Sequence, residues 1–285
     1  MRRTAPVRIA ALSAVAALVL TSCLEEGGDT NDDGHEVEAA QPQETDRLQQ
    51  VLDAGELAVC TTGDYPPFTE LDEDTDELTG IDVDMAQHLA DTMGVDIEWV
   101  NTSWDSLMED FLASCDVAVG GISMNPDRAE QVFFTEPILE DGKTPIARCE
   151  NAANYQSIND INQPDVTSIF PEGGTNQEFA EANYPDGELV THANLAIFDE
   201  LAAGNADVMT TDRAEVLYIA NEYDALCATL PDETFDYSLM GYMLPQDDAT
   251  FKHYVDQWLT IALNDGTYED IAEPWVGNVE LSMDN

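Results

Sequence analysis

Hydrophobic and polar positions follow two patterns along the chain, one typical of strands and one typical of amphipathic helices. An apolar run at 57–62 predicts a short buried strand, and further strands are predicted at 97–100 and 117–121. Between them, apolar side chains recur every three or four residues at 81–93 and 107–112, which predicts helices. Strands that alternate with helices are typical of a parallel sheet, so the sequence predicts an α/β fold.

The same alternation continues to the end of the chain. A helix is predicted at 46–54, a second series of strands and helices at 150–236, and a strongly periodic helix at 251–259. Ligands of parallel sheets bind at the carboxyl ends of the strands, so binding residues are expected directly after predicted strands. The segments concerned are 63–68, 101–104, 120–128, 171–176 and 211–215.

The N-terminal segment has the layout of a secretory signal. Three arginines precede an apolar run at 9–20 that is too short to span a bilayer. Residues 20–23 (Leu-Thr-Ser-Cys) close this run and resemble a bacterial lipobox, in which Cys23 would carry a lipid. The alternative is an ordinary thiol near a plain signal-peptidase site. Residues 24–44 carry eight acidic residues and no Lys or Arg, which predicts a disordered tether.

Charge narrows the possible partners. The chain has 59 Asp and Glu against 9 Lys and Arg, so no basic patch for nucleic acid can be assembled. The acidic residues are spread along the whole chain, which favours adaptation to a salty environment, where self-repulsion is screened. With so few cations, those in predicted binding segments are candidates for a site: Arg128, Lys143 and Arg213.

Two blocks of sequence resemble the extracellular amino-acid-binding proteins. They are residues 80–86 (Gly-Ile-Asp-Val-Asp-Met-Ala) and residues 121–137, which contain Gly-Ile-Ser, Arg128 and Phe-Thr-Glu-Pro. The resemblance implies a two-lobed α/β fold of the type II periplasmic-binding-protein kind, with two hinge strands and a cleft between the lobes. The chain would cross near 146 and return near 240. The expected division is a signal in 1–23, a tether in 24–44, lobe 1 in 45–145, lobe 2 in 146–239 and a return to lobe 1 in 240–285.

Within that family, five further blocks resemble the cyclohexadienyl dehydratases. These enzymes convert prephenate to phenylpyruvate and arogenate to phenylalanine. For this chain we expect no metal or other cofactor. The blocks are residues 61–65, 102–104, 141–146, 173–176 and 254–259. The segment 170–172 departs from the pattern, because Pro171 removes a side-chain hydrogen bond and Glu172 adds a negative charge near an anionic substrate.

The resemblance implies roles for particular residues. Arg128 would bind one carboxylate of the substrate, and Lys143 would serve the second carboxylate as a catalytic cation. Glu215 would be the proton donor, because burial in a closed cleft would keep it protonated near neutrality. The alternative for Glu215 is a first-turn residue that stabilises the helix dipole. Further substrate contacts are expected from Asp64, Tyr65, Trp104, Gly121, Ser123, Thr175, Asn176 and Asp212.

The cysteines other than Cys23 fall into two pairs. Cys149 follows one predicted hinge and Cys227 precedes the other, so these two are expected to form a disulfide, with buried free thiols as the alternative. Cys60 and Cys115 are expected to be small buried hydrophobes, because their strands place them out of register. No Cys and His spacing indicates a metal site.

Two functions therefore remain open, each with its own partners. A dehydratase would act on a small molecule and touch the membrane only through its N-terminal lipid, on the extracellular or periplasmic side. An amino-acid receptor would also deliver its ligand to an ABC permease. Lys143 and Glu215 together distinguish the two functions, because a receptor needs neither residue.

Overall fold

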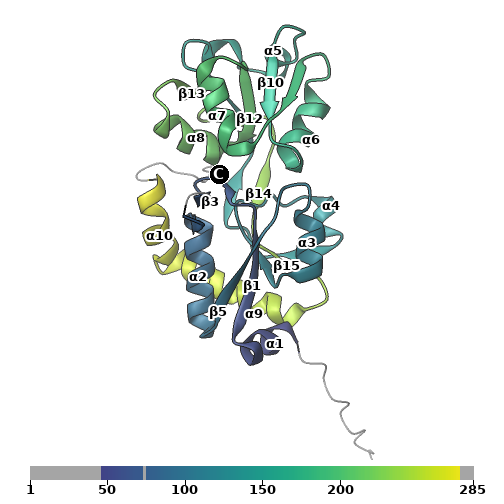
Figure 1. Ribbon diagram of the computed structural model, residues 1–285, viewed down its shortest axis with the longest axis vertical. Helices are drawn as coiled ribbons and strands as arrows, with labels where there is room; N and C mark the ends of the chain where they lie inside the picture. Colours follow the sequence, from purple (N-terminus) through teal and green to yellow (C-terminus); the bar gives the residue numbers. More distant parts are fainter. Residues whose placement is uncertain (1–45, 73–74, 277–285) are drawn as a thin grey trace, which may run out of the picture. The chain divides into compact units, whose positions relative to one another are not determined.

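The protein is described by a computed structural model over residues 46–72 and 75–276 (Figure 1). Its strands form two five-stranded sheets, a three-stranded sheet and a two-stranded pair. The expected signal, lipobox and tether lie outside the described residues. Among the helices that are described, none is both long enough and apolar enough to cross a membrane.

The sheet of lobe 1 uses residues from both ends of the described chain, in the order β5-β1-β6-β15-β7. β1 runs parallel to β5 and β6, whereas β15 is antiparallel to β6 and β7. The strands are β1 (Glu56–Thr61), β5 (Asp96–Asn101), β6 (Val117–Ala118), β7 (Val132–Phe134) and β15 (Met243–Pro245). A smaller sheet contains β2 (Asp64–Tyr65), β3 (Thr69–Asp72) and β4 (Glu77–Thr79). The helices of this lobe are α1 (Arg47–Ala54), α2 (Ile81–Met93), α3 (Leu107–Ser114), α4 (Pro126–Ala129), α9 (Ala249–Asn264) and α10 (Thr267–Val276).

Helix α2 illustrates why the sequence folds this way. Its apolar positions at Ile81, Met85, Leu89 and Met93 share one face and are all buried in the lobe 1 core, as the periodicity predicted. The helix ends at Gly94, whose left-handed conformation (φ 72°) favours glycine. Packing of this face against the sheet holds the start of α2 beside the loop after β6.

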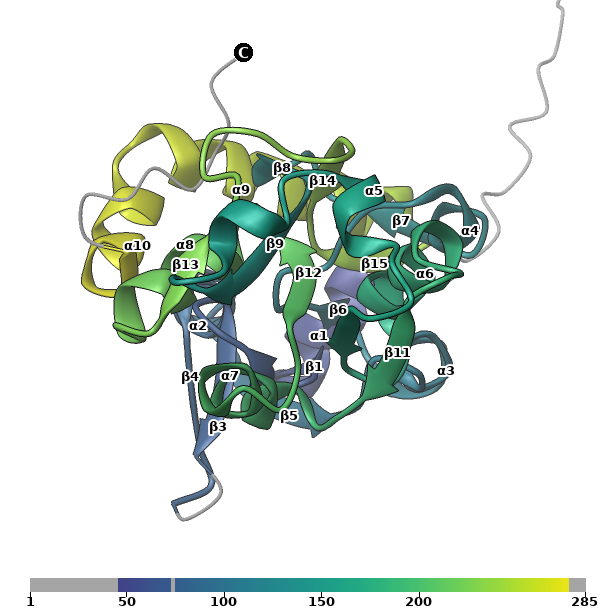
Figure 2. The same cartoon turned by 90° about the horizontal axis from the view of Figure 1, so that it is seen from above.

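Lobe 2 contains the second large sheet, in the order β11-β10-β12-β9-β13. Helices α6 and α8 lie on opposite sides of β12 (Figure 2). The strands are β9 (Lys143–Arg148), β10 (Thr167–Phe170), β11 (Glu188–Thr191), β12 (Val208–Asp212) and β13 (Leu226–Ala228). The helices are α5 (Ile158–Ile161), α6 (Gly174–Asn183), α7 (Asn194–Ala203) and α8 (Arg213–Glu222), with a 3-10 turn at Ala152–Asn154.

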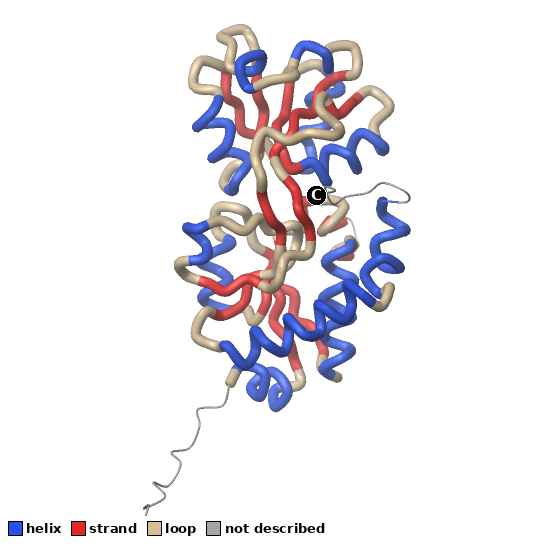
Figure 3. Tube along the Cα trace, turned by 180° about the vertical axis from the view of Figure 1, so that it is seen from behind, coloured by secondary structure: helices blue, strands red, loops and turns tan. Residues whose placement is uncertain are grey.

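A two-stranded pair joins the lobes (Figure 3). It consists of β8 (Leu139–Asp141) and β14 (Ser238–Met240), which are antiparallel, with Asp141 opposite Ser238. Lys143 already pairs with Asp212 in the sheet of lobe 2, so the first crossing lies a few residues before the expected position at 146. The fold is therefore the two-lobed type II arrangement with two hinge strands that the sequence predicted.

Each lobe contains one disulfide formed by the described cysteines. Cys149–Cys227 lies in lobe 2 and is the pair that the sequence analysis expected. Cys60–Cys115 lies in lobe 1, so the expectation of two unpaired cysteines was wrong. The reason is that Cys115 is not in the neighbouring strand. It ends helix α3 just before β6, where its Cα atom is 5.8 Å from that of Cys60.

The lobe 1 disulfide is expected to contribute to stability. Replacing Cys60 and Cys115 together with alanine should lower the free energy of unfolding by about 2–5 kcal/mol, because the unfolded chain regains the entropy of an open loop. Guanidinium unfolding of the oxidised wild type and variant, at one fixed salt concentration, measures this difference. Equal unfolding midpoints for the two proteins would contradict the expected stabilisation by this disulfide.

Candidate functional site

A narrow cavity lies between the lobes, where strand ends and loops of both face each other, and the space in it for the centre of a water-sized sphere is about 10 Å³. Its position agrees with the rule that ligands bind at the carboxyl ends of parallel strands. Residues from lobe 1 on its wall are Tyr65, Trp104, Gly121 and Ser123. Those from lobe 2 are Pro171, Gly173, Gly174, Thr175, Asn176 and Asp212.

Most residues expected to bind a substrate line this cavity, and the others lie close to the lining. The expected residues on the wall are Tyr65, Trp104, Gly121, Ser123, Thr175, Asn176 and Asp212. Lys143, Glu215, Arg128 and Asp64 are not on the wall. Of the other cations considered, Arg213 is directed elsewhere, because its Nε donates to the carbonyl of Pro231.

Lys143 and Asp212 form a buried ion pair at the edge of the cavity. The two residues are direct neighbours across the antiparallel strands β9 and β12, and Nζ of Lys143 lies 2.9 Å from Oδ1 of Asp212. Lys143 also donates hydrogen bonds to Oγ1 of Thr175 (3.0 Å) and to Oδ1 of Asn176. The backbone pairing of two strands therefore places a cation behind the lobe 2 wall.

Tyr65 connects the two lobes through this ion pair. Its hydroxyl donates to Oδ2 of Asp212 and lies 3.2 Å from Oγ1 of Thr211. Burial, followed by the charges of Asp212 and Glu215, raises the pKa of Tyr65 well above its ordinary value. The phenol is therefore a hydrogen-bond donor here, and its ring packs edge-on against Trp104.

Glu215 lies in the first turn of α8 and is fully buried. Its Oε2 accepts a hydrogen bond from Oγ1 of Thr211 (2.6 Å), and Oε1 has no hydrogen-bond partner among the described residues. Burial raises the pKa of this carboxyl well above its ordinary value, and the charges of Asp212 and Asp64 act in the same direction. Together these effects favour a protonated carboxyl group, which could donate a hydrogen bond.

Thr211 connects this acid to the cavity wall. Besides its hydrogen bond to Glu215, the hydroxyl of Thr211 accepts one from Nδ2 of Asn176 (2.8 Å) and approaches the hydroxyl of Tyr65. Asn176 and Tyr65 both face the cavity. The hydroxyl of Thr211 thus links Glu215 to the lining residues. The sequence analysis did not predict this link.

Arg128 is a buried cation on the lobe 1 side. Asn125 caps the short helix α4 and sets the position of Arg128, whose Nη1 donates to the carbonyl oxygen of Ser123 (2.8 Å). The residue is only 8% exposed, and burial lowers the pKa of its guanidinium. No acidic side chain of the described residues lies within ion-pair distance of it. A buried cation without a counter-ion is suited to receive a carboxylate.

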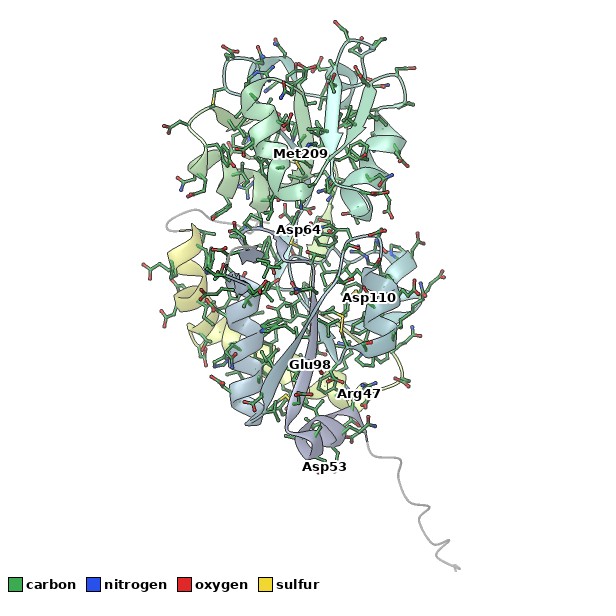
Figure 4. All side chains as sticks on the ribbon, viewed as in Figure 1. Arg47, Asp53, Asp64, Glu98, Asp110 and Met209 are labelled. Carbon is green, nitrogen blue, oxygen red and sulfur yellow. A yellow bond between two sulfur atoms is a disulfide. The ribbon has the colours of Figure 1, made fainter. Side chains whose placement is uncertain are left out.

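Asp64 lies where the lobes meet but does not line the cavity (Figure 4). Its Oδ1 accepts a hydrogen bond from Nε1 of Trp104 (3.0 Å), and burial raises its pKa. It lines a neighbouring, more open pocket together with Glu172 and His192. Trp104 therefore separates Asp64 from the cavity, and its expected contact with a substrate is not supported by this geometry. Of the two departures from the family pattern, Pro171 lies on the cavity wall and Glu172 does not.

Asp82 is a supporting residue that the sequence analysis did not single out. It lies in the second position of α2 and accepts hydrogen bonds from the backbone N–H groups of Gly120 (3.0 Å) and Gly121 (2.8 Å) and from the hydroxyl of Tyr242 (2.8 Å). Gly121 must be glycine, because its φ is +66° and a Cβ atom would lie 2.7 Å from Tyr65. Asp82 thus holds the loop that forms the lobe 1 wall. Its position in the block 80–86, which resembles the amino-acid-binding proteins, was the sequence signal that could have identified this role.

Asp141 has a similar supporting role near the hinge. This fully buried residue ends β8 and accepts hydrogen bonds from the N–H groups of Gly142 (2.7 Å), Arg213 (2.9 Å) and Ala214 (3.1 Å). It therefore caps the start of α8, the helix that carries Glu215. Burial and then the charge of Asp212 raise its pKa to about 7. Sequence reasoning could not find this contact, because 72 residues separate Asp141 from Arg213.

Comparison with known proteins agrees with this geometry. The family described as bacterial extracellular solute-binding proteins, family 3, matches residues 57–278. The cyclohexadienyl dehydratase of Pseudomonas aeruginosa is 44% identical over 238 residues, which cover 83% of this chain and 88% of that protein.

Two solved structures are also similar. An ancestral amino-acid-binding protein, described as a precursor of cyclohexadienyl dehydratase, is 30% identical with a TM-score of 0.73, and the match covers 80% of this chain and 99% of that one. An ancestral cyclohexadienyl dehydratase is 42% identical with a TM-score of 0.52, and the match covers 82% of this chain and 97% of that one.

The buried carboxyl of Asp82 leads to a prediction about pH. Burial is the largest cause that raises its pKa, from 3.8 to about 6, so the folded protein holds this proton more tightly than the unfolded chain. The stability that this proton provides is present at pH 4 and is lost as the pH rises past 6. The free energy of unfolding of the wild type minus that of Asp82→Asn should therefore fall by about 2–3 kcal/mol from pH 4 to pH 7.

The control for this measurement is Asp84→Asn, two residues further along the same helix and exposed. Its difference from the wild type should change little over the same pH range. An Asp82→Asn difference that stays constant from pH 4 to pH 7 would show that the pKa of Asp82 is not raised.

Proposed function

The chain belongs to the bacterial extracellular solute-binding proteins of family 3, and from this premise we propose that it is a cyclohexadienyl dehydratase. It would convert prephenate to phenylpyruvate and arogenate to phenylalanine. The observation that carries the proposal is Glu215, a fully buried carboxyl with raised pKa that lies behind the cavity wall, near which the cations Lys143 and Arg128 are also buried. The 44% identity to a cyclohexadienyl dehydratase over most of both chains supports the same function.

The reaction requires a proton donor more than it requires a nucleophile. The ring hydroxyl of the substrate leaves as water once it is protonated, and the ring carboxylate leaves as carbon dioxide. The electron pair of the broken carbon–carbon bond enters the ring, which becomes aromatic. Because hydroxide is a poor leaving group, a positioned general acid contributes most of what the protein must add.

Glu215 is suited to be this acid. Burial, and then the negative charges of Asp212 and Asp64, raise the pKa of its carboxyl well above the ordinary value, which favours the protonated form. The hydroxyl of Thr211 connects it to the cavity side, where the substrate hydroxyl would lie. A fixed, buried acid needs little solvent reorganisation when the proton moves.

The two cations are suited to hold the acidic groups of the substrate. Arg128 is buried beside Ser123 without an acidic partner among the described residues, so a substrate carboxylate would supply the missing charge. Lys143, in contrast, is shared with Asp212 and with the polar wall of Thr175 and Asn176. Arg128 is therefore the stronger anchor, and Lys143 mainly balances the charge of Asp212 on the lobe 2 wall.

An amino-acid receptor of an ABC transporter is the second candidate function. It is supported by the family and by the likeness to an ancestral amino-acid-binding protein, with a TM-score of 0.73. A receptor, however, has no use for a buried protonated acid. We therefore give the dehydratase priority, and a permease partner belongs only to the receptor alternative.

The location and environment of the protein are also proposals. We propose that Cys23 carries a lipid and that the protein is held on the outer side of the cell membrane by its N-terminal segment. The excess of 59 acidic over 9 basic residues supports activity in a salty medium. On this basis, assays belong in molar salt, where the Debye length is about 3 Å.

Glu215→Gln tests the proposed acid. The variant should lose turnover of prephenate by at least about a hundredfold, because general acid catalysis is removed, while substrate binding is retained. The rate is read from the ultraviolet absorbance of phenylpyruvate, and binding from calorimetry. Glu222→Gln, at the exposed end of the same helix, is the matched control and should keep wild-type turnover. Wild-type protein that binds amino acids tightly and forms no product from prephenate would favour the receptor instead.

Arg128→Gln tests the carboxylate anchor. Removing charge-assisted hydrogen bonds to a carboxylate should lower kcat/KM for prephenate by about 10–100-fold. Arg47→Gln is the control, because Arg47 is a partly exposed residue paired with Asp116 and distant from the cavity wall. If Arg128→Gln binds and converts prephenate as well as Arg47→Gln does, Arg128 does not hold the substrate.

A further inference from the structure

A chain of hydrogen bonds in lobe 2 ends at the carboxyl group of Glu215, and its direction is fixed from the other end. The ammonium group of Lys143 has only donors, so Oδ1 of Asn176, which it contacts, must accept. This contact decides the orientation of the amide. Nδ2 of Asn176 therefore donates to Oγ1 of Thr211 (2.8 Å), and the hydroxyl proton of Thr211 is available to another acceptor.

Two groups are within reach of this threonine proton. Oε2 of Glu215 lies 2.6 Å from Oγ1 of Thr211, whereas the hydroxyl oxygen of Tyr65 lies 3.2 Å from it. The phenol proton of Tyr65 is directed to Oδ2 of Asp212, so Tyr65 can only accept from Thr211. The shorter contact favours donation from Thr211 to Glu215.

Donation to Oε2 leaves the other oxygen of Glu215 to carry the acidic proton. Oε1 is buried and has no hydrogen-bond partner among the described residues. Buried polar atoms normally have partners, so an unpartnered one needs an explanation. A proton on Oε1 is not engaged within the described part of the protein, and a substrate hydroxyl could receive it. After this proton has left, Oε2 of the carboxylate still accepts the hydrogen bond from Thr211.

From this arrangement we infer that Thr211 is a positioning residue for the proposed dehydration, on which this inference rests. Its hydroxyl directs the acidic proton of Glu215 to Oε1 and stabilises the carboxylate that forms as this proton moves to the substrate hydroxyl, which leaves as water. Glu215 regains a proton from solvent before the next turnover. A hydrogen bond that is stronger to the carboxylate than to the neutral acid favours the transition state over the ground state.

The acidity of Glu215 offers a separate measure of this role. Burial raises the pKa of its carboxyl well above the ordinary value, and the hydrogen bond from Thr211 is the largest effect that lowers it. Loss of the hydroxyl should therefore raise this pKa further, by about one pH unit, which is the value of one hydrogen bond to a charged group. The protonated acid is the active form, so the fall of kcat/KM at high pH should move to higher pH.

Thr211→Val tests the inference, because it keeps the branched shape of the side chain and removes the hydroxyl. For prephenate, kcat should fall about tenfold, and the high-pH limb of the kcat/KM profile should move up by about one pH unit. Thr211→Ser keeps the donor and should retain the wild-type limb and most of kcat. The control is Thr210→Val, which removes the hydroxyl of the preceding buried residue, bonded to Tyr184, and should leave the limb in place. The position of the limb does not depend on the fraction of folded protein.

Titration of Glu215 without substrate separates this inference from the proposed function. Carbon NMR of protein labelled at the glutamate carboxyl carbons follows this group, whose signal is assigned by its absence in Glu215→Gln. Thr211→Ala, a smaller variant that also lacks the hydroxyl, should titrate like Thr211→Val. A higher pKa in these variants than in the wild type, without turnover of prephenate, would reject the dehydratase and keep the role of Thr211. An unchanged pKa, a limb that does not move, or a Thr211→Ser variant that behaves like Thr211→Val would overturn the inference and leave the dehydratase in place.

Discussion

The contact between Asp212 and its two partners is the interaction on which the site depends. Strand pairing places Lys143 next to Asp212 within lobe 2, and the hydroxyl of Tyr65 reaches the same carboxylate from lobe 1. One side chain thus joins a hinge-adjacent strand, a helix start and the opposite lobe. A buried ion pair stabilises little by itself, but the added hydrogen bonds from Tyr65 to Asp212 and from Lys143 to Thr175 and Asn176 favour one arrangement of its neighbours.

Two buried aspartates hold the supports of this contact in place. Asp82 holds the glycine loop behind Tyr65, and Asp141 holds the start of α8 behind Asp212. Both act on backbone N–H groups and leave the cavity itself to other residues. The wall is therefore supported by buried hydrogen bonds in both lobes, while the lobes are connected through the β8–β14 pair.

Local patterns in the sequence were sufficient for the alternation of strands and helices, whereas the two-lobed fold and the roles of the site residues came from the resemblance to a family. The spacing of Ile81, Met85, Leu89 and Met93 defined α2, and residues that follow strands, such as Ser123 and Asp212, reached the cavity wall. Contacts between residues far apart in the sequence could not be predicted from these patterns. The pairing of Cys60 with Cys115, the cap from Asp141 to α8 and the indole between Asp64 and the cavity each depend on how distant segments meet. These contacts depend on the register of a strand or the orientation of a ring. The local periodicity of the sequence predicts neither.

The placement of the two disulfides has a consequence for motion. Each crosslink joins residues of the same lobe, and no disulfide among the described cysteines bridges the β8–β14 pair. Oxidation after export would therefore stiffen each lobe as a separate body and add no covalent restraint to the swing between them. The disulfides would therefore stabilise each lobe, while the connection between the lobes would remain free to open and admit a ligand.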